Sequence, residues 1–335
     1  GSRGLGDVYK RQHSTVAGVP ARSITKSSNN AFKLKSKIRN LLYHIRIADF
    51  RRLREYNHYV FGKRKLMFLE LLSHSWMYGA SFENYYELQF FKKSRTECRQ
   101  YLTSSLRHEL TRQVNDPCEA LVLKDKVRFA EVFEDILGRR VMTFDEIKRQ
   151  MHDPYSISIN EVVIKPIKGQ AGQGIIFPMQ NFTSLRQLHD YVISTVKKPD
   201  EYLYEERIIQ HSALNKLNPS SLNTLRIVTY YDESINKVDV WSVVLRIGIK
   251  ACTDNFATGG IAALVDHWGV VCQPAIIKHP SGERFHIHPV SGEKITGCII
   301  PYYDQAIALA KQAAMRIPKV RSIGWDVAIT ETGPY

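Results

Sequence analysis

The sequence predicts an α+β protein in which two mixed subdomains follow a basic, helical N-terminal region. Up to about residue 111 apolar residues recur at helical spacing, whereas after residue 117 strand-like runs alternate with helical ones. The charge divides at the same place, because residues 1–117 hold 22 Lys and Arg against 9 acidic residues, and the remainder holds 25 against 24. The predicted units are a helical region over 32–117, a first subdomain over 118–200 and a second over 201–335.

The composition favours a folded protein and excludes several classes. With 335 residues and 44% hydrophobic content, the chain can bury a substantial core. It has no apolar run near the roughly 20 residues of a membrane helix, and no secretory signal is recognisable. A cytoplasmic protein is expected. The five cysteines form no C-x-x-C pair, which favours isolated buried thiols over a disulfide framework or a zinc ribbon.

Residues 1–31 are excluded from the predicted fold. The first twelve residues, "GSRGLGDVYKRQ", resemble a translated sequencing adapter, and the following segment is rich in Ser and Asn. We expect this segment to be artefactual or disordered, so the sequence leaves the natural N-terminus unknown.

The helical region is predicted from three runs of sequence. "KIRNLLYHIRIADFRRLREY" and "KLMFLELLSHSWMYGA" place apolar residues three and four apart, and Gly79 is a predicted helix stop. "FENYYELQFFKKSRTECRQYLTSS" is rich in aromatic residues, which is typical of a packed interface. No RRM, helix-turn-helix or zinc-finger pattern is present, so no nucleic acid partner is expected.

The first subdomain is predicted to alternate helices with strands. Thr143 with Glu146 fits a capping box at a helix start. Ser184 with Gln187 starts another helix, and Gly138 ends an earlier one. The predicted helices are residues 124–138, 143–151 and 185–195, and the predicted strands are 161–166 and 174–179.

The second subdomain is predicted to be rich in strands. Its runs of β-branched and aromatic residues are bounded by turn residues, and one Ala-rich run predicts a helix over 303–317. The predicted strands are residues 201–210, 224–232, 238–248, 260–271 and 324–330, with a loop over 211–221.

A lysine precedes a glycine-rich turn in "VVIKPIKGQAGQGIIF", residues 162–177. Gly169, Gly172 and Gly174 lie between two predicted strands, whereas a Walker loop or a dinucleotide fingerprint needs a helix after the loop. Glycines let backbone N–H groups approach phosphate oxygens closely, and Lys165 adds a positive charge to the same phosphates. The motif indicates a phosphate-binding hairpin, with a flexible turn as the alternative.

These motifs together resemble the ATP-grasp superfamily. "VVIKP" with its glycine hairpin, the acidic pair in "YEERI", and the arginines of "TLRIV" and "VLRIG" carry the resemblance. The set "SSLNTLRIVT…LRIG…DNFATGG…HP…GWDVAITETGP" is most similar to the sugar-transfer-associated branch, related to alpha-L-glutamate ligase-like proteins, over residues 80–335. The resemblance implies an ATP-grasp fold, with two α+β subdomains that clasp ATP.

The resemblance implies a nucleotide site in the first subdomain. Lys165 matches the strand lysine that contacts the α and β phosphates, and Lys126 matches an earlier nucleotide lysine, with Lys124 as an alternative. Glu205 and Ile208 match positions that hold adenine, and Glu206 a position near ribose. The glycines that match the flexible phosphate lid are Gly169, Gly172 and Gly174.

The resemblance also implies the catalytic residues and the metal ligand. Arg226 and Arg246 match arginines near the γ-phosphate and the acyl phosphate, and Asp326 matches the first metal carboxylate. The loop beside them corresponds to Asn255, Gly259 and Gly260. The family's E-x-N metal motif would follow "GP", but the chain ends at Tyr335. We expect a truncated reading frame that binds ATP and is a weak catalyst, which a restored E-x-N terminus would test.

The implied activity is ATP- and Mg²⁺-dependent carboxylate ligation. A carboxylate is phosphorylated to an acyl phosphate, and an amine then displaces phosphate to form a C–N bond. Such phosphoryl transfer depends on positioning and charge neutralisation, which lysine, arginine, backbone N–H groups and Mg²⁺ supply without a covalent nucleophile. ATP and Mg²⁺ are the expected cofactors. A sugar-linked or small-molecule carboxylate is the expected substrate, in modification of a polysaccharide or sugar precursor.

Structural interpretations compete with these assignments. Lys165 could be a surface strand-end lysine, Arg226 and Arg246 could be cross-strand ion-pair partners, and Glu205 with Glu206 could be a solvated pair. Asp326 could cap a strand end. His286 and His288 share a strand face, where a structural role is favoured over zinc, and Trp325 is expected in the core.

Two other functions stay open. The first is an ATP-dependent phosphotransferase that acts on a glycan. The second is a non-catalytic ATP-binding protein whose basic N-terminal region makes peripheral contact with an anionic surface.

Overall fold

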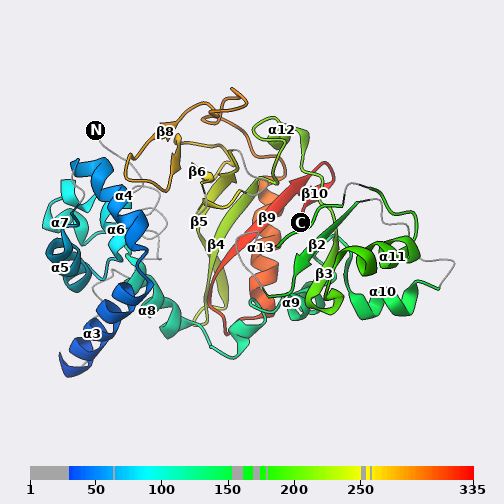
Figure 1. Ribbon diagram of the computed structural model, residues 1–335, viewed down its shortest axis with the longest axis horizontal. Helices are drawn as coiled ribbons and strands as arrows, with labels where there is room; N and C mark the ends of the chain where they lie inside the picture. The colour runs from blue at the N-terminus through cyan, green and yellow to red at the C-terminus, as the bar shows by residue number, and fades with distance from the viewer. Residues whose placement is uncertain are drawn as a thin grey trace.

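The computed structural model describes residues 30–62, 65–152, 161–168, 174–178, 180–249, 254–256 and 259–335. Figure 1 shows a group of helices at one end, an antiparallel sheet in the middle and a smaller sheet at the other end. Among the described residues, the strands form a three-stranded sheet in the order β1-β3-β2 and a seven-stranded sheet in the order β10-β9-β4-β5-β6-β7-β8. We call them the small sheet and the large sheet.

The helical region contains two helices, α4 and α5, that end at glycines. The run predicted as helical around residues 37–56 is divided by Asp49, whose carboxylate accepts hydrogen bonds from Arg51 N and Arg52 N, both at 3.1 Å, and caps the second helix. Gly62 and Gly79 both have φ of 63°, which confirms the predicted stop at Gly79. The elements are α3 (Asn30–Ile47), α4 (Phe50–Phe61), α5 (Phe68–Tyr78), α6 (Phe82–Glu87), η1 (Phe90–Lys92), α7 (Arg95–Cys98) and α8 (Ser104–Val114).

The aromatic-rich segment forms the core of this region. Phe82, Tyr85, Tyr86 and Phe90 are almost completely buried, which confirms the predicted packed interface. Their rings meet edge to face, as in the Tyr85–Tyr86 pair with centroids 5.0 Å apart. The helical residues therefore hold one another in place through a core of their own.

The small sheet carries the glycine-rich segment. Val162–Pro166 forms β2 as predicted, and the predicted capping box of Thr143 and Glu146 is present at the start of α10. The predicted strand over 174–179 is wrong in extent, because Ile176 makes only an isolated antiparallel bridge to Ile164. Pro178 lacks a backbone N–H and so cannot continue the ladder. The remaining elements are β1 (Val141–Thr143), α10 (Phe144–Gln150), α11 (Leu185–Thr195), η3 (Pro199–Glu201) and β3 (Tyr202–Glu206).

The large sheet buries one face against α13, as Figure 1 shows. Ala306, Ala310 and Ala313 of this helix pack on Leu225, Leu245 and other apolar residues of the central strands. The elements are η2 (Glu119–Leu121), α9 (Lys126–Phe133), α12 (Ser212–Asn215), β4 (Thr224–Asp232), β5 (Lys237–Ile247), β6 (Ile261–Val265), β7 (Ala275–Ile277), β8 (Arg284–Phe285), α13 (Tyr303–Arg316), β9 (Ser322–Thr330) and β10 (Gly333–Pro334).

Helix α9 is shorter than predicted and links the two sheets. It ends at Phe133 rather than near Gly138, and Phe133 packs in the core of the large sheet, where its ring meets Trp325 at 5.6 Å. At its other end, Lys126 Nζ donates a hydrogen bond to the carbonyl of Pro166 on β2. The predicted core position of Trp325 is confirmed by this packing.

The helical region contacts the segment that follows β7. Gln89 Nε2 donates to the Pro280 carbonyl at 2.9 Å, and the rings of Tyr56 and His279 meet edge to face at 5.4 Å. Lys278 Nζ lies 3.6 Å from Glu87 Oε2. Glu87 is 2% exposed, and this burial, reinforced by Glu83 and opposed by Lys278 and Arg52, raises the pKa of Glu87 to about 7.

Two expectations from the sequence, on membrane-spanning helices and on the burial of the cysteines, can be compared with the described residues. No helix among them has the length and apolar character needed to cross a bilayer. Cys98 is buried as predicted, but Cys118 is exposed and Cys272 and Cys298 are only partly buried, so the expectation of buried thiols is wrong for these three. Cys252 lies outside the described residues.

Candidate functional site

A buried carboxylate on the small sheet brings three cationic side chains together. In the β2–β3 register, Glu205 pairs with Val163 and Lys165 with Leu203, so Lys165 and Glu205 project from the same face. Lys165 Nζ lies 2.6 Å from Glu205 Oε2, and Arg139 Nε lies 3.2 Å from the same oxygen. We call Lys126, Arg139, Lys165 and Glu205 the lysine cluster.

The electrostatics of the lysine cluster favour an anionic ligand. Glu205 is 6% exposed; burial alone would raise the pKa of Glu205, but Lys165 and Arg139 outweigh it and hold that pKa below its ordinary value. Burial and the charge of Lys165 lower the pKa of Lys126, against the opposing effect of Glu205. The alternative lysine, Lys124, is exposed. Three cations thus surround one carboxylate among the described residues.

The other predicted nucleotide residues lie around this cluster. Glu206 is exposed, and Ile208 is half-buried just beyond β3. Gly174 has φ of +72°, and a Cβ there would lie 2.9 Å from Pro166 Cγ, so this position requires glycine. Gly169 and Gly172 lie outside the described residues.

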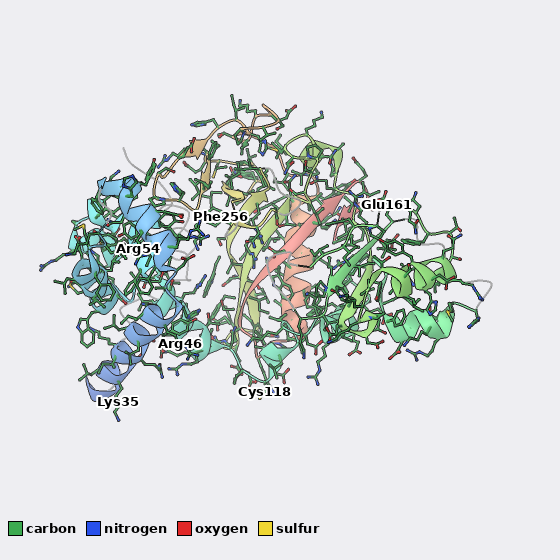
Figure 2. All side chains as sticks on the ribbon, viewed as in Figure 1. Lys35, Arg46, Arg54, Cys118, Glu161 and Phe256 are labelled. Atoms are coloured by element: carbon green, nitrogen blue, oxygen red, sulfur yellow. The ribbon has the colours of Figure 1, made fainter. Side chains whose placement is uncertain are left out.

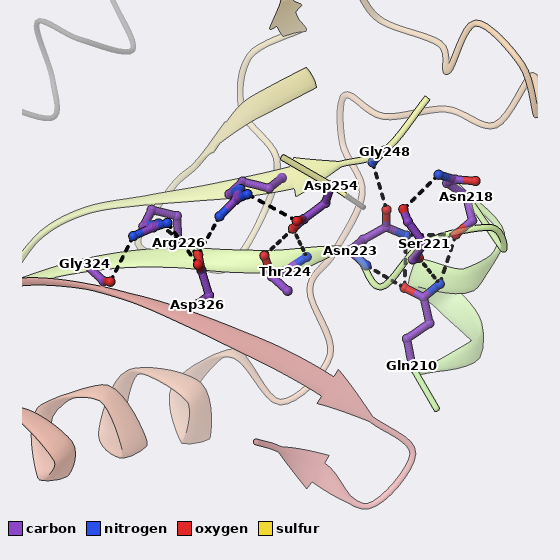
Figure 3. A network of polar contacts seen from close by, with 11 residues as sticks. Gln210, Asn218, Ser221, Asn223, Thr224, Arg226, Gly248, Asp254, Gly324 and Asp326 are labelled. Atoms are coloured by element: carbon purple, nitrogen blue, oxygen red, sulfur yellow. Dashed lines mark hydrogen bonds and ion pairs between the residues drawn. The ribbon is translucent and has the colours of Figure 1, made fainter. Parts of the chain in front are cut away.

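A second charged cluster lies on the open face of the large sheet (Figure 3). Arg226 on β4 is directly opposite Asp326 on β9, and its Nε and Nη2 each lie 2.9 Å from an oxygen of that carboxylate. Arg246 on β5 donates through Nη1 to Asp326 Oδ1 at 2.8 Å, and its Nη2 lies 3.2 Å from Asp254 Oδ1. We call these four residues the arginine cluster.

The arginine cluster balances two guanidinium groups with two carboxylates. Burial raises the pKa of Asp254, and its contacts with Arg246 and Thr224 offset this only in part. Arg246 Nε is buried and has no hydrogen-bond partner among the described residues. Both arginines were predicted near the γ-phosphate and the acyl phosphate, and the cross-strand ion pairs considered as the alternative are present. The two interpretations are compatible, because an ion pair can hold a guanidinium ready for an anion.

Asp254 is the member of the arginine cluster that the sequence reasoning missed. It directly precedes the predicted Asn255, so the signal was present in "TDNFATGG". Gly260 N donates to the Asn255 carbonyl at 3.0 Å, and a Cβ on Gly260 would lie 2.6 Å from the Asp254 carbonyl oxygen. Only glycine fits there, so the loop is tightly packed around Asp254. Gly259 adopts φ of +106° beside it.

A buried amide network, also missed, supports the start of β4 (Figure 3). Gln210 Nε2 donates to the carbonyls of Asn218 and Ser221, at 2.9 and 2.8 Å. Asn223 Nδ2 donates to Gln210 Oε1 at 3.0 Å, and Gly248 N donates to Asn223 Oδ1 at 3.3 Å. Because Asn223 precedes Thr224 and Gly248 follows β5, the network fixes the ends of the two arginine-bearing strands.

Of the histidine pair, His288 has the structural character that was favoured over zinc, and both residues lie beyond β8 rather than on one strand face as predicted. His288 is buried, its Nε2 donates to the Gly248 carbonyl at 2.9 Å, and its Nδ1 accepts from Ser291 N at 3.1 Å. Both ring nitrogens are therefore used within the chain. His286 is exposed, with Nδ1 3.2 Å from Thr296 Oγ1.

Asp326 is the residue that would hold Mg²⁺. In nucleotide sites this ion takes one or two carboxylates, with phosphate oxygens and water completing the octahedron. The Asp326 side chain is 44% exposed, so its carboxylate fits Mg²⁺ in ligand type, whereas the mostly buried Asp254 pairs with Arg246 and Thr224. No group of three or more His, Cys, Asp or Glu side chains forms a metal cage within the described part of the chain, so the nucleotide would have to supply ligands.

The structure thus has two antiparallel sheets, with the lysine cluster on one and the arginine cluster on the other. The family model of sugar-transfer associated ATP-grasp proteins matches residues 105–335. The chain therefore belongs to the sugar-transfer associated ATP-grasp family, as its motifs predicted. The match begins at the start of α8.

Comparison with solved structures gives distant matches to synthetases and ligases. D-alanyl-alanine synthetase A from Vibrio cholerae is 10% identical with a TM-score of 0.33, over 66% of this chain and 56% of that one. A bifunctional glutathione synthetase from Pasteurella multocida is 15% identical with a TM-score of 0.33, over 65% and 31%. D-alanine–D-alanine ligase from Bacillus anthracis is 11% identical with a TM-score of 0.33, over 69% and 62%.

These neighbours do not identify a substrate. This chain spans from about a third to under two thirds of their lengths. At such low similarity the family match alone carries the assignment. Comparison with curated proteins gave no match.

Proposed function

We propose that this protein is an ATP- and Mg²⁺-dependent ligase that activates a sugar-linked carboxylate as an acyl phosphate and transfers it to an amine. The observation that carries the proposal is the arginine cluster, in which Arg226 and Arg246 converge on Asp326 from adjacent strands. The family membership of the chain supports the ATP-dependent part of the reaction.

The arginines would stabilise charge on the transferring phosphoryl group. The substrate carboxylate oxygen attacks the γ-phosphorus, the bond to the β-phosphate oxygen breaks, and ADP leaves with the bond electrons. Guanidinium groups fixed by carboxylates need little reorganisation as negative charge develops beside them. Arg226 is the more accessible of the two, with its side chain 35% exposed against 13% for Arg246.

The lysine cluster would hold the leaving diphosphate. Lys126 and Lys165 carry more positive charge than Glu205 neutralises, and both are partly accessible. Bound Mg²⁺ would supply further charge neutralisation at the phosphates. In the second step, an amine attacks the acyl carbon, phosphate leaves, and the amine loses one proton. Because ATP is a cytoplasmic metabolite, this reaction would take place in the cytoplasm.

Trapping of the acyl phosphate tests the proposal. Uronic acids and other sugar carboxylates are incubated with ATP, Mg²⁺ and hydroxylamine, and both ADP and the hydroxamate are measured. A substrate should give the two products in equal amounts. Arg246→Ala should lower the rate about 100-fold or more, because a transition-state contact is lost. Arg186→Ala, on the exposed face of α11, is the matched control and should have no effect.

Two other outcomes of this experiment would overturn the ligase proposal. ADP with a phosphorylated glycan and no hydroxamate would identify the phosphotransferase alternative. Binding of ATP with no turnover on any carboxylate or glycan would favour the non-catalytic alternative.

A further inference from the structure

Helix α3 presents an apolar stripe to solvent. Leu34, Ile38 and Leu42 are 50%, 45% and 60% exposed. Their spacing of four residues places them along one side of the helix. In Figure 1 this helix projects from the helical region, away from the large sheet. The stripe is therefore accessible along an element that stands out from the protein.

The apolar surface continues onto α5. Helices α3 and α5 are joined through His44 Nδ1, which lies 2.8 Å from Ser75 Oγ. Leu69 of α5 is 83% exposed and Trp76 is also exposed. Lys37 Nζ on α3 lies 5.5 Å from the Trp76 ring centroid, so the two helices meet beside these apolar residues. An indole next to a lysine is typical of side chains at a membrane interface.

Basic side chains accompany the stripe. Lys35, Arg39 and Arg46 are exposed on α3, and Figure 2 shows Lys35 toward the outer end of the helix and Arg46 toward the body of the protein. The sequence of α3 contains no Asp or Glu. Leucine and isoleucine side chains with a cationic flank form the pattern of a helix that lies in a lipid interface.

We propose that α3 and the exposed residues of α5 dock the protein on an anionic lipid bilayer. Leu34, Ile38 and Leu42 would enter the boundary between headgroups and acyl chains, and the basic side chains would contact anionic headgroups. Nucleic acid would leave the aliphatic stripe without a partner. A second copy of α3 would bring two cationic helices together. This inference does not depend on the proposed reaction.

Vesicle co-sedimentation of the full chain tests the docking. The vesicles are phosphatidylcholine alone or with about one third phosphatidylglycerol, at low and high salt. Binding is expected only to the anionic vesicles and should weaken as salt rises, because screening shortens the reach of surface charges. Each basic residue near the surface contributes about 1 kcal/mol, so Lys35→Gln with Arg39→Gln and Arg46→Gln should weaken binding about 100-fold at low salt.

A second variant tests the aliphatic contribution. Leu34→Ser, Ile38→Ser and Leu42→Ser together should weaken binding at least about tenfold, because several buried CH₂ groups are lost. The matched controls are Ile235→Ser, Val290→Ser and Ile299→Ser for the apolar set, and Arg186→Gln, Lys197→Gln and Lys216→Gln for the basic set. Both controls should bind as the parent does, and thermal melting verifies folding of every variant.

Several results would overturn the proposal. These are no binding to anionic vesicles, equal binding to neutral ones, or anionic binding that neither α3 variant weakens. Binding to nucleic acid or to an acidic protein in place of the vesicles would overturn it too.

Discussion

The lysine cluster and the arginine cluster both hold cationic side chains with carboxylates, but they differ in burial and in charge balance. In the lysine cluster, Glu205 is buried and receives Lys165 and Arg139 on one oxygen, with Lys126 nearby. In the arginine cluster, Arg226 and Arg246 share Asp326, which is partly accessible, and Arg246 also pairs with Asp254. The first therefore has excess positive charge, and the second is balanced.

The difference shows that charge balance as well as burial determines how a carboxylate behaves. The pKa of Glu205 is lowered because two cations outweigh its burial. Burial raises the pKa of Asp254. Arg246, which also pairs with Asp326, offsets this only in part, and the negative charge of Asp326 raises the pKa of Asp254 further. Under the proposed function, the lysine cluster would bind the polyphosphate, and the arginine cluster would respond to charge that develops during the reaction.

The largest expected effect is on stability. Glu205→Ala should lower the free energy of unfolding by about 3 kcal/mol, because it leaves Lys165 and Arg139, both partly buried, without their carboxylate. Asp326→Ala should cost less than about 1 kcal/mol, because its ion pairs are partly solvated. Urea denaturation measures both, with the exposed Glu206→Ala as the control. Equal losses at Glu205 and Asp326 would contradict the contrast in burial.

The next effect concerns nucleotide affinity. Lys165→Met should weaken ATP binding about 10- to 100-fold, since a charge-assisted contact contributes about 1.5–3 kcal/mol. Asp326→Asn should leave Mg²⁺-free ATP binding undiminished, because it removes negative charge from the arginine cluster. Isothermal titration calorimetry without Mg²⁺ measures both variants, and a thermal melt verifies their folding. Weaker Mg²⁺-free binding by Asp326→Asn would contradict the balanced-charge interpretation.

The smallest expected effect is on the pH dependence of stability and concerns Glu87, a buried carboxylate 3.6 Å from Lys278. Its raised pKa of about 7 means that its protonation favours the folded state. This contribution is complete below the ordinary pKa near 4.5 and is lost as pH rises through about 7. Glu87→Gln should therefore stabilise the protein by about 2 kcal/mol at pH 8 and have little effect near pH 5.

Urea denaturation at both pH values measures this difference, with the exposed Glu55→Gln on α4 as the control. The pH dependence of stability is opposite for Glu205, because its pKa is lowered. Its contribution to the stability of the fold is present above its ordinary pKa and is lost as the medium becomes acidic. A Glu87→Gln variant that is stabilised equally at both pH values would contradict the assignment.

Local signals in the sequence predicted much of the fold. The capping box of Thr143, the stop at Gly79 and the strand before Pro166 depend on interactions within a few residues, and all three are present. The prediction of a full strand after the glycine turn was wrong. Apolar residues alone do not show whether a segment pairs with another strand along its whole length. The break at Asp49 was missed although its capping chemistry is local.

By itself, the sequence determined the alternation of helices and strands, the basic character of the N-terminal region and the motifs that identify the family. These depend on periodicity, composition and short spacing. Only the tertiary structure decided that Arg139 joins Lys165 on Glu205, and that Asp254 shares Arg246 with Asp326. Such pairings join residues tens of positions apart, because strand register and side-chain burial, rather than local spacing, bring them together.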